Sequence, residues 1–169
     1  MRYFKIFPIV LFSILVFFLY WKIKNIDESK QLSSALLNKN FPYLDLETLE
    51  ASVNLNELVG KKGFIVNYFA SWCAPCRIEH EVLKKVSKDF IIVGIGYKDT
   101  KENINKFINE LGNPYELIMM DYNGTAAIEL GLYGVPESYL VNRDGIIKYR
   151  QVGPLTEEKF NNIVYLLYD

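Results

Sequence analysis

The sequence has few residues that cross-link chains or bind metals: two cysteines and one histidine in 169 residues. Both cysteines lie in a single motif, Trp72-Cys73-Ala74-Pro75-Cys76, which excludes a framework of several disulfides. A disulfide that closes so small a loop adds little loop-closure stability. A zinc site needs four ligands, and His80 is the only other candidate nitrogen. Two thiols one turn apart at a helix start therefore favour a redox switch over half a zinc site or a chance pair.

Positive charge is also scarce outside the amino terminus. Residues 1–24 contain four basic residues and no acidic ones, whereas 25–169 contain 15 basic and 20 acidic residues. A nucleic-acid-binding protein would be expected to show the opposite balance. Half of the residues are hydrophobic, which excludes a disordered chain and is enough for one domain with a real core.

The one long apolar run, Ile6 to Trp21, indicates a membrane segment. It is slightly shorter than the roughly 20 residues that cross a bilayer, but Ile23 and the flanking lysine stems can extend it. Residues 22–31 offer no small-x-small cleavage site, so an uncleaved anchor is favoured over a cleaved signal peptide. We expect an anchor at 1–24, a polar tether at 25–40 and a globular domain at 41–169.

Strands and helices alternate along the globular part. The apolar run 64–69 is typical of a strand that is buried on both faces. The segment 76–89 reads as a helix with a stripe of Ile78, Val82, Leu83 and Val86. We expect further helices at 52–59, 101–111, 125–130 and after Thr156, and strands at 90–97, 116–120, 138–141 and 146–151. This pattern predicts an α/β fold with a mixed sheet and helices on both sides.

Four segments carry a family resemblance over about 63–153: 67–80, which contains the Cys-x-x-Cys motif, 96–99, 112–115 and 131–140, which contains Tyr-Gly-Val-Pro-Glu. Together they resemble the membrane-anchored thioredoxin-like proteins of cytochrome c maturation, the CcmG or DsbE family. The resemblance implies a thioredoxin fold with a mixed central sheet, preceded by a single transmembrane helix. It also implies that no cofactor is needed beyond a redox-active Cys73–Cys76 disulfide.

The two cysteines have different expected roles. Unpaired amide groups and the helix dipole at a helix N-terminus stabilise a thiolate and lower its pKa, so Cys73 is the expected nucleophile. Cys76, one turn deeper, resolves the mixed disulfide. The resemblance makes Pro136 a cis proline beside the disulfide, where Val135 and Pro136 bind an extended substrate; an ordinary trans turn proline is the alternative.

Acidic residues are the third expected element. General thioredoxins place a buried aspartate six residues before the first cysteine, but here that position is Asn67. The resemblance assigns acidic groups near the thiols to Glu79 and Glu137. Such a carboxylate would accept the proton of Cys76 and would make the substrate groove acidic. The alternative for each glutamate is a solvated surface position.

Two aromatic residues complete the candidate site. We expect Trp72 to form a substrate-docking surface beside the thiols rather than part of the core. His80 follows Cys76 by four residues, and a structural role is favoured over a catalytic one. The sequence offers too few ligands for a metal site.

The resemblance predicts an enzyme, a thiol:disulfide oxidoreductase on the bacterial inner membrane with its catalytic domain in the periplasm. Its expected partners are apocytochrome c or the haem-ligation proteins, and a CcdA- or DsbD-type membrane protein as electron donor. Two alternatives remain: a TlpA-like reductase for copper-site thiols in oxidase assembly, and a non-enzymatic chaperone that handles metal or haem.

Overall fold

The computed structural model describes residues 7–24, 36–49, 60 and 62–168. The chain divides into two compact units, residues 1–32 and residues 33–169. The first unit contains helix α1, Phe7–Lys24, whose side chains are exposed from Phe7 to Lys22. Within the described residues, no helix has both the length and the apolar character needed to cross a membrane. The membrane anchor therefore stays a prediction.

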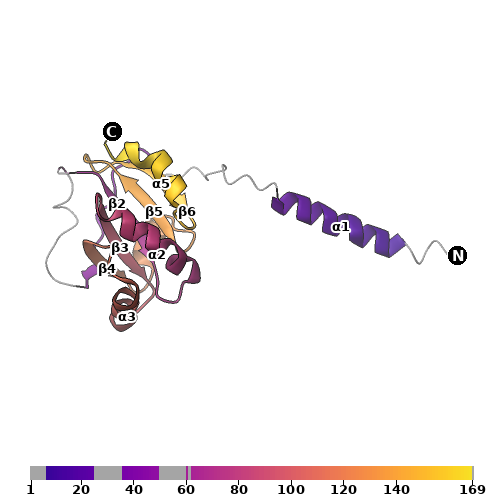
Figure 1. Ribbon diagram of the computed structural model, residues 1–169, viewed down its shortest axis with the longest axis horizontal. Helices are drawn as coiled ribbons and strands as arrows, with labels where there is room; N and C mark the ends of the chain where they lie inside the picture. Colours follow the sequence, from indigo (N-terminus) through magenta and orange to yellow (C-terminus); the bar gives the residue numbers. More distant parts are fainter. Residues whose placement is uncertain (1–6, 25–35, 50–59, 61, 169) are drawn as a thin grey trace. The chain divides into compact units, whose positions relative to one another are not determined.

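The second unit is built on a six-stranded mixed sheet with the order β1-β4-β3-β2-β5-β6 (Figure 1). Its strands are β1, Glu47–Thr48; β2, Phe64–Phe69; β3, Ile91–Tyr97; β4, Leu117–Asp121; β5, Glu137–Val141; and β6, Ile147–Val152. Strands β2, β3 and β4 run parallel, and every other pairing is antiparallel. The predicted strands are all present, with bounds that differ by at most one residue. The short β1 was not predicted.

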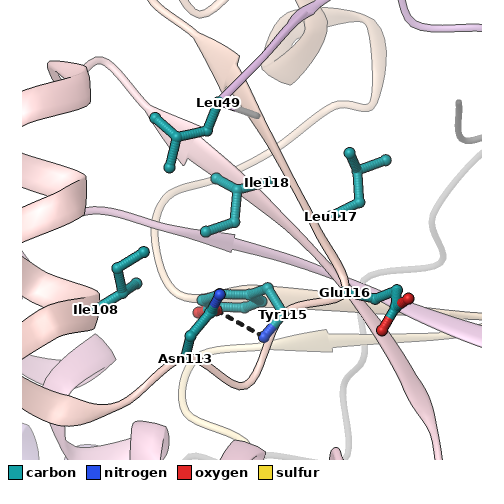
Figure 2. A pocket seen from close by; sticks show the side chains of 7 residues that line it. All are labelled: Leu49, Ile108, Asn113, Tyr115, Glu116, Leu117 and Ile118. Atoms are coloured by element: carbon teal, nitrogen blue, oxygen red, sulfur yellow. Dashed lines mark hydrogen bonds between the residues drawn. The ribbon is translucent and has the colours of Figure 1, made fainter. Parts of the chain in front are cut away.

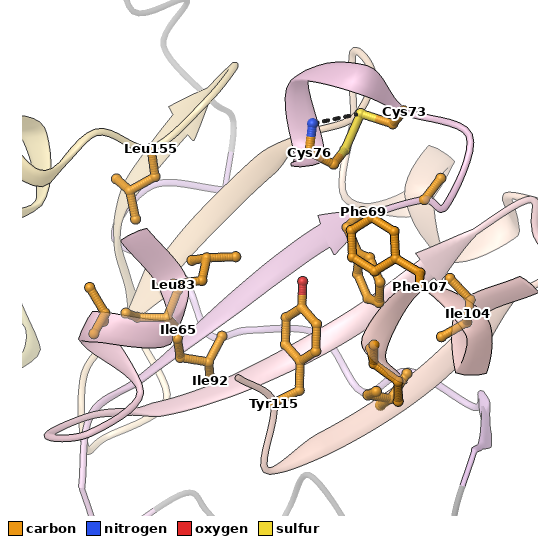
Figure 3. Packing of buried hydrophobic residues seen from close by; sticks show 14 of the residues in the cluster. Ile65, Phe69, Cys73, Cys76, Leu83, Ile92, Ile104, Phe107, Tyr115 and Leu155 are labelled. Carbon is orange, nitrogen blue, oxygen red and sulfur yellow. Dashed lines mark hydrogen bonds between the residues drawn. A yellow bond between two sulfur atoms is a disulfide. The ribbon is translucent and has the colours of Figure 1, made fainter. Parts of the chain in front are cut away.

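Helices cover both faces of this sheet. They are α2, Ala74–Val86; α3, Lys101–Leu111; α4, Thr125–Glu129; and α5, Glu157–Ile163, which continues as the 3₁₀ helix η3, Val164–Leu167. Side chains of α2, α3 and α5 join one hydrophobic cluster, part of which Figure 3 shows. Side chains of α4 join a second cluster on the other face. The predicted α/β fold with helices on both sides is confirmed.

Strand β2 separates these clusters by simple alternation. Ile65 and Phe69 belong to the cluster beneath α2, whereas Phe64, Val66 and Tyr68 belong to the cluster beside α4. The same alternation sends Glu137 and Tyr139 of β5 to one face and Ser138 and Leu140 to the other. This division decides which polar side chains reach the cysteines.

The predicted stripe on α2 was wrong at Ile78, which is 73% exposed. Leu83 and Val86 are buried as predicted, and the other buried positions are Cys76, Glu79 and His80. Helix α2 also begins at Ala74, earlier than expected. Glu79 and His80 are polar, but each has a hydrogen-bond partner in the interior, and such partners offset the cost of burying a polar group. A prediction from apolar residues alone therefore chose the wrong buried face for the first turn of α2.

The packed unit includes residues that the sequence pattern placed in the tether. Leu36 and Leu37 pack against the second cluster, and the Asn38 amide donates a 2.8 Å hydrogen bond to the carbonyl of Ile147. The predicted helix at 52–59 lies outside the described residues. The helix 101–111 has the expected bounds, capped by Thr100, whose hydroxyl accepts from Asn103 N.

Candidate active site

The two cysteines form a disulfide at the N-terminus of α2 (Figure 3). Cys73 is the N-cap residue, with an extended backbone, and its Sγ accepts a 3.1 Å hydrogen bond from Cys76 N. Pro75 lies in the first turn, where it costs no helical hydrogen bond. Both side chains are at least 96% buried by neighbouring residues, since Cys73 is 4% exposed and Cys76 is 2% exposed. The Cys76 amide at this helix end faces the sulfur of Cys73, and together with the helix dipole it favours a negative charge there.

The loop before β5 lies beside the disulfide. The Val135–Pro136 peptide bond is cis, as predicted. The Sγ of Cys73 is 3.5 Å from the carbonyl oxygen of Val135. This contact brings two segments together that are 62 residues apart in the chain. Any polypeptide that reaches the disulfide therefore also meets the backbone of Val135.

Two exposed aromatic side chains border this region. Trp72 is 60% exposed, with its Nε1 donating to the carbonyl of Lys98 at 3.3 Å. Its exposure agrees with the expected surface position. Tyr133, which the sequence reasoning did not single out, is 61% exposed and precedes Val135 by two residues. The guanidinium carbon of Arg150 lies 4.7 Å from the centre of the Tyr133 ring.

Glu79 lies on the buried side of α2, one turn after Cys76. It is 1% exposed, which excludes the alternative of a solvated helix face. One carboxylate oxygen accepts a 2.8 Å hydrogen bond from Asn67 Nδ2, and the other accepts one of 2.8 Å from Leu155 N. Burial raises the pKa of Glu79 to about 7, although both hydrogen bonds oppose this increase. A carboxyl group with this pKa can exchange protons near neutral pH.

Asn67 occupies the position where general thioredoxins have an aspartate. Its amide lies on the α2 side of the sheet and contacts Glu79, so the buried acid comes from the helix rather than from β2. The same amide donates to Ser138 Oγ at 3.0 Å and accepts from the Tyr115 hydroxyl at 3.0 Å. Tyr115 lies in the segment 112–115, which carries part of the family resemblance, but the resemblance gave this residue no role.

The expectation for Glu137 was wrong. Its side chain is fully buried on the opposite face of the sheet, where it forms an ion pair with Arg150. Its carboxylate also accepts hydrogen bonds from the Tyr139 hydroxyl at 2.8 Å and from Tyr133 N at 3.2 Å. The alternation along β5 directs Ser138, not Glu137, to the α2 side. Glu137 therefore supplies no free negative charge to a groove beside the disulfide.

Arg150 could not be identified from its local sequence, because it stands in β6, thirteen residues from Glu137. Its Nη2 donates to the carbonyl of Gly131 at 2.6 Å while its Nε donates to Glu137. Through these contacts the pair holds both ends of the segment Gly131–Tyr133. The pair thus shapes the loop that leads to Val135.

His80 has the structural position that was favoured. It is 1% exposed, and its Nε2 is 2.8 Å from the carbonyl of Gly112. The ring packs edge-on against Phe107, with 5.0 Å between centres. Burial lowers the pKa of His80, which keeps the ring neutral and able to donate from Nε2. Within the described parts of the chain, no group of three or more His, Cys, Asp or Glu side chains is arranged to hold a metal ion.

Comparisons with known proteins agree with this geometry. The Redoxin family model matches residues 33–167. The thiol:disulfide interchange protein DsbE of Tatumella citrea is 36% identical, covering 96% of this chain and 91% of that protein. The thiol:disulfide interchange protein CycY of Rhizobium leguminosarum bv. viciae is 58% identical over 94 residues, which are 54% of this chain and 50% of CycY.

The chain belongs to the DsbE family of thiol:disulfide interchange proteins. It is a thiol:disulfide oxidoreductase with a Cys73–Cys76 redox pair. A solved structure named as a DsbE from Chlorobium tepidum superimposes with a TM-score of 0.67 at 22% identity, covering 78% of this chain and 95% of that one. At this identity the likeness shows the fold alone, and the fold is that of thioredoxin-like proteins.

Proposed function

We propose that this protein reduces the disulfide of apocytochrome c, or of its haem-ligation partner, before haem is attached. The catalytic domain faces the periplasm of a bacterium and is tethered to the inner membrane by the segment 1–24. A CcdA- or DsbD-type membrane protein returns the oxidised form to the dithiol. Membership of the DsbE family supports this assignment, as does the apolar sequence of α1.

The observation that carries the proposal is the contact between Cys73 Sγ and the carbonyl of Val135, bordered by exposed Trp72 and Tyr133. A backbone carbonyl beside the reactive sulfur offers an acceptor to the backbone amide of an extended polypeptide. The exposed rings of Trp72 and Tyr133, which are close in sequence to Cys73 and Val135, add apolar contact area. This arrangement suits an unfolded polypeptide, such as an apoprotein, better than a small disulfide.

The chemistry begins from the reduced form, in which both cysteines are thiols. The thiolate of Cys73 attacks one sulfur of the substrate disulfide, and the other substrate sulfur leaves as a thiolate that takes up a proton. Cys73 and the substrate are then joined by a mixed disulfide. The amide groups at the start of α2 stabilise the attacking thiolate, because they carry the positive end of the helix dipole.

Cys76 completes the transfer. Its thiol gives its proton to the Glu79 carboxylate, and the resulting thiolate attacks Cys73 Sγ in the mixed disulfide. The Cys73–Cys76 disulfide forms and the second substrate sulfur leaves as a thiolate that takes up a proton, so two electrons pass from the protein to its substrate. Glu79 suits this step because it lies one turn from Cys76 and has a pKa of about 7.

A trapping experiment tests the proposal. The Cys76→Ser variant should attack its substrate but not release it, so a covalent complex reversed by dithiothreitol should accumulate in cells. The Cys73→Ser variant is the matched control and should trap nothing. Recovery of an apocytochrome c or a haem-ligation protein is the expected result. Recovery of copper-site assembly proteins alone would favour a TlpA-like role, and purified dithiol protein that holds a stoichiometric metal would favour a chaperone.

A further inference from the structure

A buried hydrogen-bonded chain leads from the loop before β4 to the active-site helix. The hydroxyl of Tyr115 donates to Asn67 Oδ1 at 3.0 Å, and Asn67 Nδ2 donates to Glu79 Oε1 at 2.8 Å. Tyr115 is 6% exposed and Asn67 and Glu79 are at most 1% exposed, so solvent does not replace these bonds. Each link is thus made by one specific side chain in a region of low dielectric constant.

The amide of Asn67 can face Glu79 in two ways, and only one favours a carboxylate. An amide has one acceptor oxygen and two donor hydrogens on its nitrogen. Here both hydrogens are used, by Glu79 and by Ser138 Oγ, and the oxygen is used by Tyr115. If the amide turned over, its oxygen would face the carboxylate, which repels it. The hydrogen bond that the Tyr115 hydroxyl donates to this oxygen therefore supports the orientation that suits a charged Glu79.

Tyr115 is itself held firmly by its surroundings. Its backbone amide donates to Asn113 Oδ1 at 3.0 Å, as Figure 2 shows, in the turn that follows α3. Its ring stacks on Phe69 with 4.6 Å between centres. His80, the residue after Glu79, reaches the same turn through its 2.8 Å contact with the carbonyl of Gly112. The contact of His80 thus joins α2 to the turn that carries Tyr115, whose hydroxyl group is linked through Asn67 to Glu79 of the same helix.

We propose that Tyr115 is a positioning residue for the resolving step: its hydroxyl orients the Asn67 amide so that Nδ2 stabilises the carboxylate of Glu79, the proton acceptor of Cys76. The inference rests on the proposed proton transfer to Glu79 and adds the residue that regulates it. Tyr115 itself neither donates nor accepts the proton that leaves the Cys76 thiol. Burial raises the pKa of Tyr115 well above its usual range, which keeps the hydroxyl protonated as a donor.

Few other ionisable groups act on Glu79. Leu155 contributes a backbone amide from the segment before α5, and β5 contributes the neutral hydroxyl of Ser138 through Asn67. Within the described parts of the chain, Tyr115 is an ionisable side chain close enough for the Glu79 charge to raise its pKa. The neighbouring His80 directs its Nε2 to Gly112 instead. Apart from burial and the Leu155 amide, the titration of Glu79 should therefore respond to the Asn67 amide.

The Tyr115→Phe variant tests this assignment, because it keeps the stacked ring and removes the hydroxyl. The resolving step is measured by stopped-flow fluorescence between pH 5 and pH 9, with full-length reduced protein and a short peptide that contains a disulfide. Carbon NMR of the Glu79 carboxyl group gives its titration directly. Without the Tyr115 hydroxyl the Asn67 amide is no longer held in place, which should disfavour the Glu79 carboxylate. The midpoint of the kinetic pH profile and the midpoint of the NMR titration should therefore both move to higher pH by about one unit, the size expected for weakening one hydrogen bond to a charge.

Tyr68→Phe is the matched control. Tyr68 is fully buried on the opposite face of the sheet, and its hydroxyl has no hydrogen-bond partner among the described residues. This variant should leave both midpoints at the wild-type value. If Tyr115→Phe lowers stability but also leaves both midpoints unmoved, Tyr115 is only structural and the inference is overturned.

The Glu79→Gln variant separates the inference from the proposed proton transfer. If Glu79→Gln keeps the wild-type pH dependence of the resolving step, Glu79 is not the proton acceptor and the proposed step fails. If Glu79→Gln abolishes that dependence while Tyr115→Phe does not shift it, only the role of Tyr115 fails. The expected result is that Glu79→Gln removes the midpoint and Tyr115→Phe displaces it.

Discussion

Arg150 donates a hydrogen bond to Glu137 within a buried ion pair, on the face of the sheet opposite α2. The arginine also lies over Tyr133 and binds the carbonyl of Gly131. These contacts link the interior to the loop that carries Val135. Glu137 therefore acts through packing and hydrogen bonding, and not as a charge presented to the substrate.

Replacing Glu137 by glutamine should destabilise the fold, because it removes the negative charge that the buried Arg150 guanidinium contacts. Loss of one member of a buried ion pair costs about 3–5 kcal/mol. Denaturant unfolding of the disulfide form measures this loss. Glu129→Gln, at an exposed position, is the control and should change stability by no more than about 0.5 kcal/mol.

The double variant Glu137→Gln, Arg150→Met provides a sharper check on the pair. Because it removes both charges, it should be more stable than the Glu137→Gln variant alone. A Glu137→Gln variant with wild-type stability would show instead that Glu137 is a surface charge, contrary to its position here.

Glu79 should make stability depend on pH. Its pKa in the folded protein is about 7, above its ordinary value of 4.5, so the folded state holds this proton more tightly than the unfolded state. Stability that is present below pH 4.5 is then lost progressively as the pH rises to about 7. This contribution amounts to about 3 kcal/mol.

Unfolding curves of the disulfide form at pH 4.5 and pH 8 measure the effect. Glu79→Gln should flatten the difference between the two pH values, whatever its effect on absolute stability. The exposed Glu158→Gln variant should keep the wild-type difference. An unaltered pH dependence in Glu79→Gln would contradict the raised pKa.

The amino-terminal segment should retain the protein on membranes. Since no small-x-small site follows the apolar run, the mature protein should keep residues 1–21, sediment with membranes and resist carbonate extraction. The same catalytic domain behind a cleavable signal should be released as a folded, soluble protein. A mature amino terminus near Asn25 would identify the segment as a signal peptide.

Local pattern was sufficient for much of this protein. Periodicity, capping residues and turn residues close in sequence predict three features: the bounds of the helix 101–111, the strand 64–69 and the position of the cysteines at a helix start. The resemblance added the cis bond before Pro136, which no local signal distinguishes from an ordinary turn. The helix, the strand and the cysteine positions depend on neighbours along the chain, so one sequence reveals them.

Tertiary packing decided the roles of the polar residues. The alternation of side chains along a strand predicts that Glu137 and Ser138 point to opposite faces of the sheet. Only the assembled sheet shows that α2 covers the face of Ser138. Glu79 is buried while Ile78 is exposed, because Asn67 and the Leu155 amide meet Glu79 from β2 and from the segment before α5. A polar group is stable in the interior only where distant partners supply hydrogen bonds, and those partners come together only in the folded chain.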